Sequence, residues 1–135
     1  MIDIMPKVFT TIRDALPSSI DVTNVEQMVS ESFPCVTIQE ISNITYTRSQ
    51  DESLMEHHAR VGYSINVYST VSDTEARAIA MTVDLLMQNM KFTRTQFKPT
   101  PNLDHTIHRY TAVYEAIVAE GVTDGNMTTY QMYRR

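Results

Sequence analysis

The sequence predicts an α+β fold in the order helix-β-β-helix-β-β, an antiparallel four- to five-stranded sheet with two main helices packed on one face. Two segments carry apolar residues at helical spacing, and four others alternate apolar with polar residues. Because the strands come in consecutive pairs, they are expected to form antiparallel hairpins. The 135 residues suit a single domain, residues 1–135, which is long enough to bury its own core.

The two helices are recognisable by their apolar stripes and their ends. The first runs from Ile4 to Leu16, with Asp3 able to cap its start and Pro17 ending it. The second opens on the capping-box sequence Ser72-Asp73-Thr74-Glu75 and continues to about Met90. This second helix is expected to be the main cover of the sheet. Its predicted core residues are Ile79, Val83, Leu86, Met87 and Met90.

Four segments are predicted as strands: Pro34 to Ile44, His58 to Thr70, Phe92 to Phe97 and Thr106 to Val118. Alternation places one set of large side chains on the face that meets the helices. That set is Val61, Tyr63, Ile65, Val67, Tyr110, Ala112, Tyr114 and Val118.

The remaining segments are predicted as connections. Residues 47–56, 98–105 and 121–125 have the composition of loops or turns, and residues 21–32 fit either a short helical turn or a strand. The end of the chain, residues 126–135, either pairs as an edge strand or stays loose.

The last long strand has apolar side chains on both faces. Ile107, Val113 and Ile117 lie opposite the set described above, together with Arg109 and Glu115. Two interpretations are about equally supported. Either other parts of the same domain cover this second face, or it packs on a neighbouring subunit.

Several function classes find no support in the composition. The net charge of −5 disfavours a protein that grips nucleic acid, and no apolar run is long enough to span a membrane. With only three glycines, the sequence contains no phosphate-binding loop motif. The single cysteine, Cys35, is expected to be buried, in a protein of a reducing compartment. The histidine pairs 57–58 and 105/108 have poor spacing for chelation. We therefore expect no catalytic residues, no metal site and no cofactor.

Charge is distributed unevenly along the chain. Asp51, Glu52 and Glu56 make one predicted loop acidic, whereas Lys91, Arg94 and Lys98 make the third strand and its exit basic. These residues, with Arg109, are the predicted subunit interface, in which the acidic loop of one copy meets the basic strand of the next. The alternative is two separate solvated patches.

The back half of the chain has a recognisable pattern, SDTEARAIAMTVDLLMQNM followed by FTRTQFKPTPNLDHTIHRYTAVYEAIV. In these residues it resembles tail terminator (tail completion) proteins of long-tailed bacteriophages. The front half agrees in layout: an N-terminal helix, the strand FPCVTI, a charged loop and ARVGYSINVYS.

The resemblance implies a structural virion protein rather than an enzyme. Such a subunit forms a ring, usually a hexamer, on the head-proximal end of the tail tube. There it stops tube polymerisation and offers a joining surface to the head connector, or head-completion protein. The ring is assembled in the host cytoplasm, and DNA passes through its lumen without sequence-specific binding.

Three other interpretations remain open at this point. The chain could be another phage neck ring protein, a head-completion or adaptor subunit. It could be a small enzyme that uses Cys35 or the histidines. It could also be a monomeric binding module that covers its second strand face with its own C-terminal tail.

Overall fold

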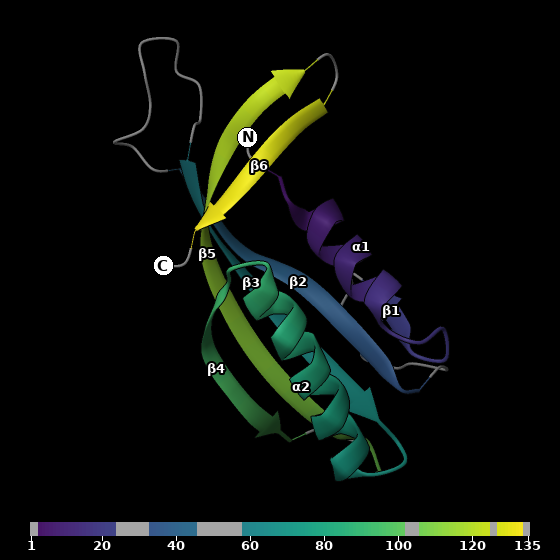
Figure 1. Cartoon of the computed structure of the whole chain (residues 1–135). Helices are drawn as coiled ribbons and strands as arrows, with labels where there is room; N and C mark the ends of the chain where they lie inside the picture. Colours follow the sequence, from purple (N-terminus) through teal and green to yellow (C-terminus); the bar gives the residue numbers. More distant parts are fainter. Residues whose placement is uncertain (1–2, 24–32, 46–57, 102–105, 125–126, 134–135) are drawn as a thin grey trace.

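The computed structural model describes residues 3–23, 33–45, 58–101, 106–124 and 127–133. In this part of the chain two helices lie against one face of a mixed sheet, so the fold class is α+β (Figure 1). The strand order is β1-β2-β3-β5-β4, and β6 pairs with β5 beyond this path. The elements are α1 (Met5–Ala15), β1 (Asp21–Thr23), β2 (Cys35–Thr45), β3 (His58–Ser69), α2 (Asp73–Asn89), β4 (Thr93–Thr100), β5 (His108–Asp124) and β6 (Met127–Tyr133).

Both helices lie within one residue of their predicted bounds. The N-cap of α1 is Ile4 rather than Asp3, whose Oδ1 accepts a hydrogen bond from the N–H of Met5 at 3.1 Å. The hydroxyl of Ser72 accepts a hydrogen bond from the backbone N–H of Glu75 at 3.1 Å, so Ser72 caps α2. At the other end, Lys91 has φ 69°. The N–H groups of Lys91 and Phe92 bond back to Gln88 and Met87, which closes the last turn. Neither helix has the length and apolar character needed to cross a membrane.

The core lies between the helices and the face of the sheet that they cover. All eight strand residues expected on that face are buried, and Ala112 is the most exposed of them at 5%. From α2, Ile79, Val83 and Met87 are buried, while Leu86 and Met90 are partly buried against the same cluster. Each large side chain fully buried contributes roughly 1.5–3 kcal/mol, so this interface holds the helices on the sheet.

One strand pair corrects the expectation of an entirely antiparallel sheet. β2–β3, β3–β5, β4–β5 and β5–β6 are antiparallel, but β1 runs parallel to β2 with Asp21 opposite Cys35. β1 falls within residues 21–32, which the sequence left ambiguous. Three residues are too few to show a period of two, so a pairing of this kind leaves no pattern in the sequence.

Two predicted connections are also wrong in part. β4 continues through Pro99 to Thr100, where a loop was expected. Proline is tolerated there because β4 pairs with β5 on one side and its other edge meets no described strand. Gly121 to Asp124, expected to turn, instead extend β5, which pairs with β6 as the edge-strand alternative predicted. The predicted acidic loop lies in residues 46–57, outside the described residues.

Candidate functional site: the outer side of helix α2 and strand β4

Two tyrosines on β5 fix the position of α2 along the sheet. The hydroxyl of Tyr110 donates to Asp73 Oδ2 at 2.9 Å, and that of Tyr114 donates to Asp84 Oδ1 at 2.8 Å. The tyrosines are about 13 Å apart along the strand, and the carboxylates about 16 Å apart along the helix. Because these spacings nearly match, α2 lies along β5 and runs in the same direction.

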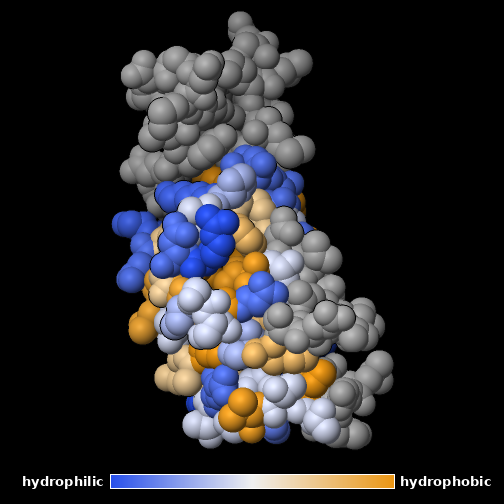
Figure 2. Space-filling model, turned by 90° about the vertical axis from the view of Figure 1, so that its right-hand side faces the viewer, coloured by the Kyte–Doolittle hydropathy of each residue, from blue (hydrophilic) through white to orange (hydrophobic). Residues whose placement is uncertain are grey.

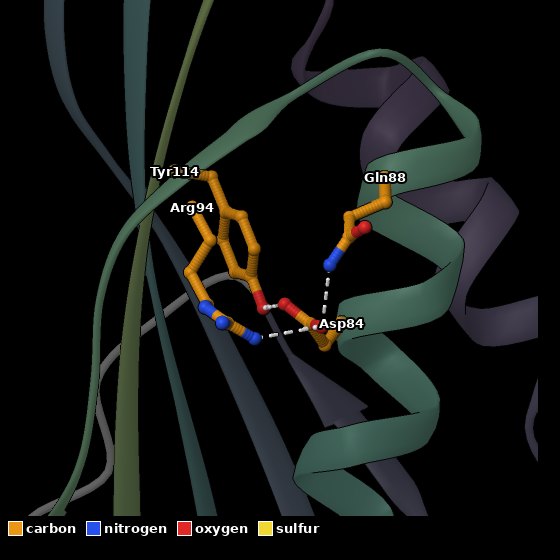
Figure 3. Close-up of polar contacts among 4 residues, drawn as sticks. All are labelled: Asp84, Gln88, Arg94 and Tyr114. Atoms are coloured by element: carbon orange, nitrogen blue, oxygen red, sulfur yellow. Dashed lines mark hydrogen bonds and ion pairs between the residues drawn. The ribbon is translucent and has the colours of Figure 1, made fainter.

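Asp84 joins three elements through one carboxylate (Figure 3). Besides the Tyr114 hydroxyl, it accepts from Arg94 Nη1 at 3.0 Å and from Gln88 Nε2 at 2.7 Å. Asp84 is only 8% exposed, and a carboxylate so placed needs such donors to offset its lost hydration. The cluster ties α2 to both β4 and β5.

Arg94 connects this cluster with the surface of the protein. It lies opposite Tyr114 in the β4–β5 register, on the helix side of the sheet, and its side chain is 45% exposed. Its guanidinium also lies 5.6 Å from the centre of the Phe97 ring. Next to it is a hollow of about 350 Å³ lined by Arg77, Met81, Asp84, Leu85, Arg94 and Phe97, which we call the α2–β4 hollow.

The wall of the α2–β4 hollow exposes two large apolar side chains. Met81 is 52% exposed and Leu85 64%, and with Arg77 they follow one another at four-residue spacing along the outside of α2. Single exposed apolar residues are normal, and the side of the molecule where α1 lies mixes hydrophobic with hydrophilic residues (Figure 2). Two adjacent ones beside a hollow and two arginines are typical of an interaction surface.

The neighbouring edge of β4 is poorly suited to pairing with another strand. The β4–β5 register shifts between Arg94 and Gln96, Lys98 is exposed, and Pro99 lacks an N–H group. A bulge, a lysine and a proline are the features that protect edge strands from β-addition. A partner on this side is therefore expected to contact side chains of the α2–β4 hollow rather than extend the sheet.

The helix-free face of the sheet carries a polar network. Asn66 Oδ1 accepts from Arg109 Nε at 3.0 Å and from Thr111 Oγ1 at 2.7 Å, and Arg109 lies over the Tyr68 ring at 5.4 Å. The apolar residues expected on this face of β5, Ile107, Val113 and Ile117, are half-buried. Contacts within the chain thus occupy much of the face that the sequence left without a cover.

The structure separates the basic residues of the predicted interface. Arg94 lies on the helix side of β4, Lys98 opposite Thr111 on the other side, and Lys91 in the turn before the strand. Arg109 belongs to the network around Asn66. The acidic partners Asp51, Glu52 and Glu56 lie outside the described residues.

The described histidines and the cysteine do not come together. His58 pairs with Ala119 at one end of β3, and His108 pairs with Ser69 at the other, roughly 36 Å away at about 3.3 Å per residue. Cys35 is buried on β2 opposite Tyr68. Among the described residues no group of three or more His, Cys, Asp and Glu side chains could hold a metal ion, and His57 and His105 lie outside them.

Sequence reasoning missed the α2–β4 hollow, although part of it left a signal. Met81 and Leu85 are apolar, four residues apart and off the main stripe of the helix, which indicates a second apolar strip. The sequence gives no sign of the role of Asp84, because two of its three partners, Arg94 and Tyr114, come from other elements. No protein-family model and no curated protein matches this sequence.

We expect Asp84→Ala to lower the free energy of unfolding by about 2–3 kcal/mol, because it leaves the Tyr114 hydroxyl buried without an acceptor. Asp73→Ala is the matched control, since it removes the same kind of bond at an exposed carboxylate and should cost less than about 1 kcal/mol. Urea unfolding of both variants measures the difference. Equal losses would mean that Asp84 is not the stronger of the two attachments.

Two buried tyrosine hydroxyls resist ionisation. Burial raises the pKa of Tyr114 well above its ordinary value, and its hydrogen bond to Asp84 raises that pKa further. Burial likewise raises the pKa of Tyr63, with the nearby charge of Glu40 as the next cause. The Tyr63 hydroxyl donates to Glu40 Oε1 at 3.0 Å, so both rings must stay neutral to keep their bonds.

This predicts a loss of stability at high pH. A tyrosine in the unfolded chain ionises near pH 10, so the stabilisation is complete below about pH 10 and is lost as the pH rises above it. Each of these tyrosines should contribute a fall of about 1.4 kcal/mol per pH unit in the free energy of unfolding. Urea unfolding from about pH 8 to about pH 11 spans this titration. Over that range the free energy of unfolding of Tyr114→Phe should fall less steeply, by the share that Tyr114 contributes. An unchanged slope would refute the assignment.

Proposed function

We propose that this protein is a structural subunit that assembles with copies of itself into a ring, and that the ring is a phage tail terminator. In this role it caps the head-proximal end of the tail tube, stops tube polymerisation and provides the surface that joins tail to head. We also propose that the α+β fold of this chain is the fold of tail terminators.

The observation that carries the proposal is the α2–β4 hollow. It exposes Met81 and Leu85 beside Arg77 and Arg94, and it lies on a helix held rigidly by the Asp84 cluster. A ring needs a surface that meets a different surface on the next copy. Because the helix backbone is already held in place, ordering of the backbone adds little to the cost of binding, which favours such a contact.

Two further observations fit the proposal. The antiparallel order β2-β3-β5-β4, with both helices on one side, keeps the segments that carry the sequence resemblance together in one sheet (Figure 1). The net charge of −5 suits a lumen through which DNA passes without binding. The partners in the particle would be the tail tube protein and the head connector.

The test is deletion of this gene from the phage genome that carries it, followed by electron microscopy of the particles. We expect overlong tails, or tails without heads, because nothing would stop the tube or join it. Expression of the full chain in trans should restore normal particles. Tails of normal length joined to heads in the deletion strain would refute the proposal.

A matched pair of variants connects this test to the α2–β4 hollow. Leu85→Asp should fail to restore normal tails, because it places a charge on the proposed contact. Val71→Asp alters an apolar residue that is 74% exposed outside the hollow, and it should restore them. The reverse pattern would place the contact elsewhere.

A further inference from the structure

We infer that the α2–β4 hollow of one copy binds the opposite margin of the next copy's sheet, where Asp3 and Glu40 are exposed. The inference rests on the proposed function, because it names the two surfaces that meet between neighbouring subunits of the ring. The occupant is a second copy of this chain, and its contacting surface is acidic. We call that surface, formed by Asp3, Glu40 and Ile41, the β2 margin.

The α2–β4 hollow is basic. Arg94 is paired with Asp84 at 3.0 Å, which leaves that pair nearly neutral. Arg77 is exposed on α2 and forms no ion pair with any described residue. One unbalanced positive charge therefore lines the hollow, and the exposed part of Arg94 has further N–H groups to offer to a carboxylate.

The β2 margin carries unbalanced negative charge. Glu40 Oε1 accepts a hydrogen bond from the Tyr63 hydroxyl at 3.0 Å. Burial is the main cause that raises the pKa of Tyr63, and the charges of Glu40 and Asp3 raise it further, so both carboxylates lie near that hydroxyl. Neither carboxylate forms an ion pair with a residue in the described part of the chain. The two surfaces are therefore complementary in charge.

The register places these two surfaces at opposite ends of one row of the sheet. Glu40 pairs with Tyr63, Tyr63 with Tyr114, and Tyr114 with Arg94. Because directly opposite residues point to the same face, Glu40 and Arg94 both lie on the helix side of the sheet, where the two tyrosines are buried. The row spans three strand spacings, roughly 14 Å, so the two charges do not meet within one copy.

A ring whose axis runs along the strands brings the two ends of this row together. Rotation about such an axis moves a row sideways without changing its height, so the Glu40 end of one copy meets the Arg94 end of the next. The contact is head-to-tail, because the two surfaces differ, and it can therefore close into a ring. Ile41, at the neighbouring bulge, is 51% exposed and supplies an apolar side chain for Met81 and Leu85.

Cross-linking between isotope-labelled and unlabelled full chains tests the inference. The variant Arg77→Lys places an amine in the hollow, and a carbodiimide joins an amine to a carboxylate in direct contact with it. Mass spectrometry should find position 77 of one chain joined to Asp3 or Glu40 of another. Thr82→Lys is the matched control, because Thr82 is exposed on α2 but does not line the hollow, and it should form few such links.

The variant Glu40→Gln gives an independent measurement. It removes the charge but keeps an oxygen that can accept from Tyr63, so urea unfolding should show that the fold is retained. Sedimentation should show self-association weakened by on the order of tenfold. Asp14→Asn removes an exposed carboxylate at the other end of α1 and should leave association unchanged.

The outcomes separate this inference from the proposed function. Rings in which position 77 joins only carboxylates of its own chain, or none, would overturn the inference and leave the proposed function standing. Unchanged association of Glu40→Gln would do the same. Chains that stay monomeric at every concentration, and whose gene deletion leaves tails normal, would overturn both.

Discussion

The structure depends on the attachment of helix α2 to strand β5. Apolar burial of Ile79, Val83 and Met87 draws the helix onto the sheet, but burial is non-directional and permits sliding. The bonds from Tyr110 to Asp73 and from Tyr114 to Asp84 remove that freedom, because each needs one helix position opposite one strand position. They fix where every other side chain of α2 points.

That attachment determines the character of the outer surface. Arg77 lies seven residues before Asp84, nearly two turns, and so lies on almost the same side of α2, whereas Met81 and Leu85 are turned further toward solvent. Arg94 is drawn to Asp84 from β4, which forms the second wall of the α2–β4 hollow. A rigid, partly apolar surface beside a strand edge that resists β-addition is suited to binding by side chains. The proposed role in assembly rests on this surface.

The sequence predicts what is local and misses what depends on distant partners. The apolar stripe of α2, its Ser72 cap and the buried alternation of β3 can be read from short windows. Short windows do not reveal the parallel pairing of β1 or the continuation of β4 through Pro99, because both depend on which strand lies alongside. The bonds among Asp84, Arg94 and Tyr114 could not be predicted, since they join residues of different elements. Arg109, a residue of the predicted interface, bonds to Asn66 within the chain, and its place at an interface stays a prediction.

The most direct test of the central claim is the structure of the assembled particle by electron cryomicroscopy. We expect a closed ring in which each copy contacts its neighbour through the outer side of α2 and the adjoining face of β4. Met81 and Leu85 should then be buried by the next copy, although they are 52% and 64% exposed in the single chain. A ring in which α2 faces solvent, or in which copies join by extending the sheet at β4, would contradict it.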